Sequence, residues 1–278
     1  MVDKPGGMTS HDVVARVRRL ARTRKVGHAG TLDPMATGVL VLGLNRATRL
    51  LGHLTMTDKR YEATVRLGAT TTTDDAEGDP VDARPTDALT GDAVRAVLAS
   101  FVGELDQVPS AVSAVKVGGK RAYARVRAGE AVELPPRRVT VHALEVTRMA
   151  LPDVEISVHC SSGTYVRAIA RDLGEALGVG GHLTALRRTA VGPFSLETAH
   201  TLDELEEHFV AVPIAEAARA SFPSLDLDDA RSADVRVGRR LDVPLTTNTA
   251  LFAPDGELLG LYGPGPGDGG ARAVAVFV

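Results

Sequence analysis

Tryptophan is absent from this 278-residue sequence and aromatic residues make up only 4% of it, so its core must be built mainly from aliphatic side chains. The 44% of hydrophobic residues is enough for a sizeable core, in one large domain or two unequal ones. The only cysteine, Cys160, excludes an intrachain disulfide and a multi-thiolate zinc site, and it fits a reducing compartment. No apolar run approaches the roughly 20 residues needed to span a bilayer, and residues 1–7 lack the apolar core of a signal peptide. We therefore expect a soluble, cytoplasmic protein.

The formal net charge of −3 does not by itself favour a nucleic-acid partner, but the charges are unevenly distributed. Residues 1–70 contain twelve Lys and Arg against five Asp and Glu, and residues 111–195 contain twelve against seven. The segments 71–110 and 196–278 are acidic. Phosphates respond to the local potential rather than to net charge, so one interpretation is a basic RNA-binding face. Ordinary solvated helix surfaces are the other interpretation, and composition leaves both open.

Apolar periodicity predicts helices and strands without the regular βαβ order of a doubly wound fold, which favours an α+β class with a mixed sheet. Ser10 is expected to cap a helix that runs to about Arg24. Tyr61, Ala63 and Val65 alternate with polar residues, which predicts a half-buried strand. The other expected helices cover 46–54, 90–101, 118–129 and 165–177, with one more opening at 201; the other expected strands cover 39–42, 112–115, 139–149 and 154–160; and 70–85 is expected to be an acidic loop.

The composition changes at about Phe222, after which the chain is acidic and rich in Pro and Gly. Short strand-like runs over 250–253, 258–262 and 273–278 predict a small β-rich appendage. A unit of 57 residues, from 222 to 278, is near the lower limit for independent folding, so we expect it to dock on the main body.

The most distinctive segment covers residues 27–38 and reads GHAGTLDPMATG. Its three glycines allow tight turns and close backbone approach, and Pro34 biases Asp33 towards an extended conformation. A carboxylate at the tip of such a loop, beside a buried strand, can project into a cleft. Taken alone, the residues also allow an ordinary turn in which Asp33 bonds its own backbone and His28 is a surface histidine. No Gly-Lys-Ser/Thr follows, so this is not a phosphate-binding P-loop.

This segment resembles the catalytic motif of the TruB family of tRNA pseudouridine synthases, GH(A/T)GxLDPxATG, at every fixed position. Further blocks match in family order, and the resemblance covers residues 2 to about 200. It implies the pseudouridine synthase fold, a mixed and largely antiparallel central sheet flanked by helices, over residues 1–220. A thumb-like RNA-binding insertion is expected at about 117–138, and residues 222–278 are expected, by position alone, to form a PUA-like RNA-binding domain. The matching blocks are Asp3-Lys4-Pro5 with Gly7 and Ser10; Lys59-Arg60-Tyr61; Leu67-Gly68 with Asp75, Ala76 and Gly78; Gln107, Pro109 and Ser110 with Ser113, Ala114 and Lys116; Cys160–Arg167; and Gly181-His182-Leu183 with Leu186, Arg187 and Arg188.

The resemblance implies conversion of a uridine in the T arm of tRNA, at position 55, to pseudouridine after base flipping. In that reaction Asp33 is the catalytic carboxylate, and Arg167 pairs with it and holds it ionised. Tyr61 stacks on the extruded uracil and is a candidate for the C5 proton step. The N-glycosidic bond breaks, the uracil rotates and a C–C bond forms, so no cofactor and no metal are expected. Attack on the ribose, attack on the base and removal of the C2′ proton all stay open for Asp33.

The same resemblance assigns substrate-binding positions. His28 is expected to fill the space that the flipped bases leave, and Tyr165 and Leu186 are expected to line the uracil pocket. Without the family match, Leu186 would be interpreted as a core residue and His28 as solvent-exposed. The basic residues expected to grip RNA from the thumb-like insertion are Lys116, Lys120 and Arg121.

Only Met1 and Val2 precede the first matching block, where family members usually have several apolar residues, so either an edge strand is shortened or the start codon is assigned too late. Two rival functions are a synthase acting on another RNA and a non-catalytic tRNA-binding folding chaperone. The chaperone would need neither Asp33 nor Arg167. No Gly-x-Ser-x-Gly or His-Glu-x-x-His motif favours a hydrolase. We expect a monomer that binds tRNA, with no membrane association and no obligate protein partner.

Overall fold

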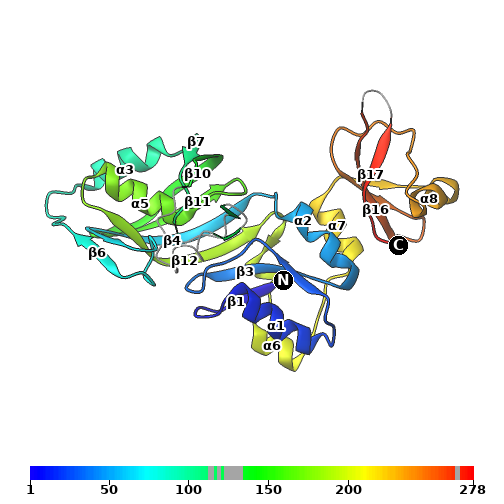
Figure 1. Cartoon of the computed structure of the whole chain (residues 1–278), viewed down its shortest axis with the longest axis horizontal. Helices are drawn as coiled ribbons and strands as arrows, with labels where there is room; N and C mark the ends of the chain where they lie inside the picture. Colours follow the sequence, from blue (N-terminus) through cyan, green and yellow to red (C-terminus); the bar gives the residue numbers. More distant parts are fainter. Residues whose placement is uncertain (112–115, 118–119, 122–133, 267–269) are drawn as a thin grey trace.

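The computed structural model describes residues 1–111, 116–117, 120–121, 134–266 and 270–278, which form a large sheet domain and a smaller C-terminal β domain (Figure 1). Within these residues the large sheet has nine strands in the order β1-β3-β12-β4-β11-β10-β7, with β2 paired to β3 and β13 paired to β12. The bounds are β1 Val2–Lys4, β2 Val26–Ala29, β3 Thr37–Leu44, β4 Lys59–Leu67, β7 Gly103–Gln107, β10 Arg137–Ala150, β11 Asp153–Cys160, β12 Gly181–Val191 and β13 Phe194–Ser195.

The pairing of these strands confirms the expected α+β class with a mixed, largely antiparallel sheet. Among the described strands of this sheet, β3 and β12 alone run parallel, with Arg188 opposite Gly38, and the other neighbours are antiparallel. Side chains alternate along β4 as the sequence predicted, with Tyr61, Ala63 and Val65 buried. This alternation turns Tyr61 towards the interior, where the candidate site lies.

Helices α3 (Gly91–Ser100) and α5 (Val166–Ala176) cover one face of the sheet (Figure 1). Helix α5 packs on β4 and β12, and α3 packs on β10 and on α5. Helix α1 (Ser10–Leu20) packs against β2 and α6 (Leu202–Glu207). None of the helices in the described part of the chain is long and apolar enough to cross a membrane.

Helix α1 differs from its prediction at both ends. Thr9, not Ser10, is the N-cap, through a reciprocal capping box. Ser10 is instead buried inside the first turn. The helix ends at Leu20 because Arg22 adopts a left-handed conformation with φ of 49°, which terminates the helix without a glycine.

The acidic segment expected to be a loop over 70–85 is partly a two-stranded sheet, so that prediction is wrong in part. Strand β5 (Ala69–Thr71) pairs with β6 (Pro80–Ala83). The four consecutive threonines at 70–73 are β-branched and favour an extended backbone, a signal that the acidic composition obscured. Asp75 lies in the connection and is only 2% exposed, which is unusual for an unassigned carboxylate.

The helix predicted over 118–129 is wrong where the structure describes the chain. Strands β8 (Lys116–Val117) and β9 (Lys120–Arg121) form an antiparallel pair, in which Lys116 lies opposite Arg121. A Gly-Gly dipeptide separates them in the sequence, and this pattern is typical of hairpin turns. The rest of the expected helix and the strand predicted at 112–115 lie outside the described residues.

The C-terminal domain is a four-stranded sheet that docks on the large domain near α2 and α7 (Figure 1). Arg49 donates a hydrogen bond to the carbonyl oxygen of Val276 at 2.8 Å, and Arg46 donates to that of Phe277 at 3.4 Å. One apolar cluster contains Leu50 of the large domain together with Phe277. The remaining elements are η1 Asn45–Arg49 and α2 Leu51–Leu54 in place of the single helix expected at 46–54, η2 Leu196–Thr198, α7 Ile214–Ser221, β14 Ser224–Asp226, α8 Asp229–Arg236, β15 Thr249–Phe252, β16 Leu258–Pro264 and β17 Ala271–Val276.

Candidate active site

Buried side chains hold the loop between β2 and β3 that carries Asp33. Lys4 is fully buried, and its ammonium donates to the carbonyl oxygen of Met8 at 2.7 Å and to that of Pro34 at 3.1 Å. Because Pro34 directly follows Asp33, this contact ties the N-terminal motif to the tip of the loop. Burial lowers the pKa of Lys4 to about 8, against the opposing effect of nearby carboxylates.

Ser10 and Arg188 hold the rest of the loop. The hydroxyl of Ser10 accepts the N–H of Leu32 at 2.9 Å and donates to its carbonyl oxygen at 3.1 Å. Arg188 is 1% exposed, and it donates through Nε to Val39 O at 2.8 Å and through Nη2 to Gly30 O at 2.9 Å. One guanidinium therefore joins the two ends of the loop through buried, charge-assisted hydrogen bonds.

Gly38, at the end of this loop, is required by the close approach of two strands. Its φ is +100°, a conformation that other residues rarely adopt, and a Cβ there would overlap the carbonyl oxygen of Arg188. The parallel contact of β3 with β12 thus depends on a glycine at the position where the sequence motif ends.

Asp33 and Arg167 are 134 residues apart in the sequence and meet in space. Nε of Arg167 lies 3.1 Å from Oδ2 of Asp33, and Nη2 donates to Oδ1 at 3.4 Å. Nη1 of the same guanidinium lies 3.5 Å from Oδ2 of Asp75 and donates to Thr73 O at 2.8 Å. The predicted two-pronged contact is therefore present, and Asp75 is a third member whose role the sequence motifs did not predict. The guanidinium of Arg167 thus bridges the two carboxylates.

The pKa of Asp33 is set by opposing effects. The sequence predicted that Arg167 would hold Asp33 ionised in its buried site. Burial nevertheless raises the pKa of Asp33 above the ordinary value of 3.8, and Asp75 raises it further, while Arg167 and Lys4 lower it. Burial is the largest of these effects, and Arg167 acts in the predicted direction, since its charge favours the ionised form of Asp33. Asp33 therefore takes up a proton at a higher pH than an exposed aspartate would.

A cavity of about 280 Å³ opens in front of Asp33 and is called the Asp33 cavity below. It is lined by Tyr61 from β4, Leu186 from β12 and Tyr165, the N-cap of α5. Tyr61 is 8% exposed and burial raises the pKa of its phenol, which therefore stays protonated at neutral pH. The structure thus brings these three predicted residues together with Asp33 and Arg167.

Three family profiles match consecutive parts of the chain. Residues 18–166 match the TruB family pseudouridylate synthase N-terminal domain, residues 167–221 match the tRNA pseudouridylate synthase B C-terminal domain, and residues 222–278 match tRNA pseudouridine synthase II, C-terminal. The first alone covers more than half of the chain. The chain belongs to the TruB family.

Relatives of similar length support this membership, so the chain is a pseudouridine synthase. The tRNA pseudouridine synthase B of Arthrobacter sp. (strain FB24) is 53% identical over 100% of this chain and 95% of its own. That of Thermobifida fusca (strain YX) is 57% identical over 94% and 92%. Among solved structures, a chain of a Cbf5-Nop10-Gar1 complex matches with a TM-score of 0.77 and 28% identity, over 100% of this chain and 84% of its own. A chain of an H/ACA RNP bound to a substrate RNA containing 2′-deoxyuridine has a TM-score of 0.75 and 27% identity, with the same coverage.

Lys59 also lines the Asp33 cavity, a role that the sequence motifs did not predict. It is 6% exposed, and its ammonium donates to Thr55 O at 3.0 Å and to Thr57 O at 2.7 Å. Burial, and next the charge of Arg188, lower its pKa to about 8. Lys59, Arg167 and Arg188 thus bring three cations to the lining of the Asp33 cavity. The available signal was a lysine at a core-facing position of an alternating strand, which is rare unless the charge is bonded.

The other predicted residues of this TruB chain lie elsewhere. His28, on β2, packs edge-on against His11 of α1 with 5.6 Å between ring centroids, and the described lining of the Asp33 cavity does not include it. Its expected role inside the RNA stays a prediction. Only the backbone pairing of Lys116, Lys120 and Arg121 is described, so their RNA contacts also stay a prediction.

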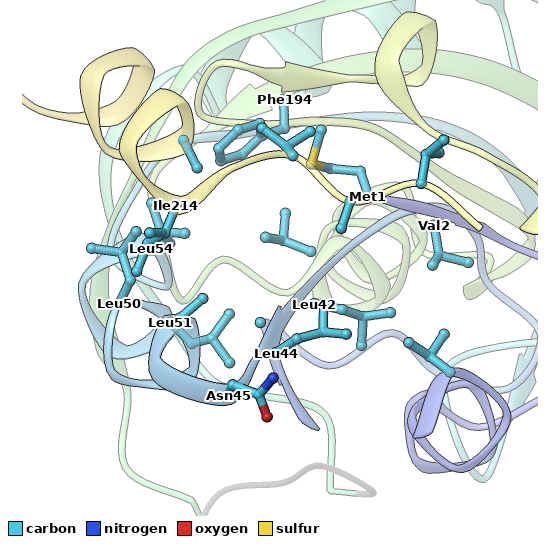
Figure 2. Close-up of a pocket in the computed structure, with 18 of the residues that line it drawn as sticks. Met1, Val2, Leu42, Leu44, Asn45, Leu50, Leu51, Leu54, Phe194 and Ile214 are labelled. Carbon is cyan, nitrogen blue, oxygen red and sulfur yellow. The ribbon is translucent and has the colours of Figure 1, made fainter. Parts of the chain in front are cut away.

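A second cavity of about 310 Å³, called the apolar cavity below, lies beside the N-terminus and against α2 and α7 (Figure 2). Met1, Leu44, Leu50 and Phe194 point into it. In its described lining Arg46 is the one charged side chain. Its described lining contains no carboxylate, histidine, cysteine or hydroxyl side chain, in contrast to the Asp33 cavity.

Proposed function

We propose that this chain isomerises the uridine at position 55, in the T arm of tRNA, to pseudouridine, with Asp33 as the catalytic carboxylate. The observation that carries the proposal is the Asp33 cavity itself. A carboxylate that is 35% exposed faces a space larger than one uracil base, while its partner Arg167 is only 5% exposed. A target base inside an RNA helix must be flipped out to reach such a group.

The chemistry requires no change in oxidation state and no group donor. Ionised Asp33 either attacks the sugar or the base, or removes the C2′ proton, and the glycosidic bond to N1 breaks. The uracil turns, C5 bonds to C1′, and the C5 proton leaves while N1 gains one. Tyr61 presents its ring to the base and its hydroxyl to the C5 proton. Lys59 lies in the wall where negative charge develops on the detached uracil, and it offsets that charge.

The choice of tRNA rests on the relatives and on the sequence motif. Relatives 52–57% identical to this chain carry the name tRNA pseudouridine synthase B. The basic residues of β8 and β9 and the C-terminal β domain, to which we assign a PUA-like role, would hold the RNA outside the cavity. We propose that the chain acts alone, as a monomer.

Tritium release from tRNA transcribed with 5-tritiated uridine tests this function. The chain should release close to one tritium per tRNA, and a matched transcript with cytidine at position 55 should release none. Release from both transcripts would place the target elsewhere in the tRNA. A T-arm minihelix should suffice as substrate, because the cavity admits one base and the proposal needs no further protein.

A second candidate is a synthase that acts on another RNA within a ribonucleoprotein. The observation that favours it is the similarity to chains solved in a Cbf5-Nop10-Gar1 complex and in an H/ACA RNP. Their identity of 27–28% is about half that of the relatives named for tRNA. Turnover on a tRNA transcript by the purified chain alone would exclude an obligate complex, and turnover only after addition of a guide RNA would favour it.

A further inference from the structure

A cluster of two histidines and one aspartate lies outside the Asp33 cavity. Asp58 directly precedes β4, His142 lies on β10 and His159 lies on β11. One ligand atom from each residue lies within 4.8 Å of the other two. Nε2 of His142 is 3.3 Å from Oδ2 of Asp58, and Nε2 of His159 is 3.8 Å from the same oxygen. The reaction proposed above uses none of these residues.

We propose that Asp58, His142 and His159 form a binding site for a divalent transition-metal ion, with Zn²⁺ as the best fit. Zinc bonds to histidine nitrogen and carboxylate oxygen are about 2.0–2.2 Å long, so tetrahedral ligands lie about 3.4 Å apart. The two distances to Asp58 bracket that value. Two imidazoles with one carboxylate are a donor set suited to zinc, iron or nickel rather than to magnesium or calcium. The fourth position opens to water, because all three side chains are between 34% and 49% exposed.

The sheet supplies the rigidity that such a site needs. β11 lies between β4 and β10, so the three ligands come from adjacent backbones. The register of β10 against β11 shifts between Val141 and Ala143, a bulge that places His142 beside His159. The rings of these two histidines lie 4.8 Å apart between centroids. The backbone of Asp58 is also fixed, since its carbonyl oxygen accepts the N–H of Gly192 at 2.8 Å.

The position of the site explains what an ion would do there. Asp58 is the neighbour of Lys59, whose ammonium is bonded to the carbonyl oxygen of Thr57 in the turn that precedes them. An ion bound to Asp58 would stiffen that turn from the opposite face of the sheet, so its role is structural and the reaction itself needs no metal. Arg60 lines the same surface hollow as Asp58 and His159. Its positive charge weakens binding of a cation, so replacing it should strengthen the site.

Calorimetric titration of the full chain with ZnCl₂ tests the proposal. The protein for this titration should carry no polyhistidine tag and should be treated with EDTA and dialysed. The titration should be run at about pH 7.5, above the ordinary pKa of imidazole. We expect one saturable site per chain. His142→Ala and Asp58→Ala should each weaken binding at least about tenfold. His208→Ala, which removes an exposed histidine on another element, should change nothing. Arg60→Gln should tighten zinc binding severalfold. Misfolding of the variant could not produce this result, because misfolding would weaken binding.

Thermal unfolding supplies an independent reading. Zinc at about a hundredfold excess over its dissociation constant should raise the melting temperature by at least about 3 °C, and EDTA should reverse the rise. His142→Ala should melt at the wild-type temperature without zinc and lose the rise. Absence of saturable binding, equal binding by wild type and His142→Ala, or equal loss in His208→Ala would each overturn the proposal. The proposed function is tested separately by turnover in EDTA, because the proposed ion lies outside the Asp33 cavity and the reaction needs no metal. Turnover in EDTA without zinc binding would overturn the metal site alone.

Discussion

The Asp33 cavity and the apolar cavity have similar volumes, about 280 and 310 Å³, and opposite chemistry. The first is lined by Asp33 and by three buried or nearly buried cations, Lys59, Arg167 and Arg188. The second is lined mostly by apolar side chains (Figure 2). Empty volume alone therefore does not mark the site of chemistry. What marks it is the convergence of charged groups from segments far apart in the sequence.

The two cavities also differ in how their walls are held. Apolar walls are stabilised by the burial of their side chains, and truncating one of these side chains costs packing energy. Buried charges are costly unless every donor is bonded, and Lys59 and Arg188 each bond two backbone carbonyl oxygens. Mutations in the apolar cavity should therefore change stability, whereas conservative changes at Asp33 and at its partner Arg167 should change mainly the rate.

Leu50→Ala should show the stability side of this comparison. Leu50 is 2% exposed and lines the apolar cavity. We expect a loss of about 2–5 kcal/mol in the free energy of unfolding, from lost burial and an enlarged void. The kcat/KM measured by tritium release should stay within about twofold of wild type. Urea unfolding gives the first quantity. A large loss of turnover with unchanged stability would break the distinction between the cavities.

Arg167→Lys should show the catalytic side. Lysine cannot reproduce the planar contact that Arg167 makes with Asp33 and Asp75 at once. We expect a rate at least about tenfold lower, which corresponds to roughly 1.4 kcal/mol in the barrier. The matched control is Arg171→Lys on the same helix, since Arg171 pairs with Asp172 and Asp74 outside the cavity. Near-wild-type kinetics for Arg167→Lys would show that the contact has no part in the reaction.

The pH profile of kcat/KM should reveal the raised pKa of Asp33. The reactive form is ionised, so the rate should fall as pH decreases through that pKa, with a midpoint above 3.8. Asp75→Asn should move the midpoint down, because it removes a charge that raises the pKa and leaves Arg167 to Asp33 alone. Asp172→Asn is the control, since burial also raises the pKa of Asp172 but outside the cavity. The measurement is kcat/KM from about pH 4 to 8. If the midpoint of the acidic side of the profile stayed unchanged in Asp75→Asn, Asp75 would have no effect on the pKa of Asp33.

Tyr61 and His28 should separate by the step that each affects. Tyr61→Phe keeps the stacking face, so RNA affinity should be nearly unchanged while the chemical rate falls. Tyr61→Leu should lose in addition about 1–3 kcal/mol of stacking. His28→Ala should slow base flipping. Its rate should therefore recover on a T-arm RNA whose loop is already unstacked, whereas the rate of Tyr61→Phe should stay low on that RNA. Single-turnover rates on both RNAs test this, and equal rescue of the two variants would end the distinction.

The sequence predicted strands better than it predicted helix ends and short hairpins. Alternation along residues 59–67 and 154–160 reports burial directly, and both strands are present as expected. The end of α1 depends on Arg22 in a left-handed conformation, for which a non-glycine residue gives no clear signal. The hairpin of β5 and β6 differs from the loop that the acidic composition predicts, because the β-branched threonines favour an extended backbone.

Local sequence patterns predicted even less of the candidate site than of the fold. The contact between Asp33 and Arg167 spans 134 residues and could be expected only from the family motif, because no local pattern predicts it. Lys4 and Lys59 are buried against expectation, since lysine is ordinarily exposed and only their three-dimensional surroundings supply carbonyl partners. Asp75 is likewise a buried charged residue of a type that is ordinarily exposed. Its burial beside Arg167 follows from how β5 and β6 fold back, which the sequence did not reveal.

Asp33→Asn tests the central claim most directly, because it removes the charge and keeps the shape. The measurement is the single-turnover rate of tritium release from a T-arm minihelix at saturating protein, with RNA affinity and melting temperature measured on the same preparation. Asp33 lies on a loop and its side chain is partly exposed, so folding and RNA binding should stay close to wild type. Turnover should fall below a few per cent of the wild-type rate. A folded Asp33→Asn variant that binds RNA and retains more than that would contradict the assignment of Asp33 as the catalytic carboxylate.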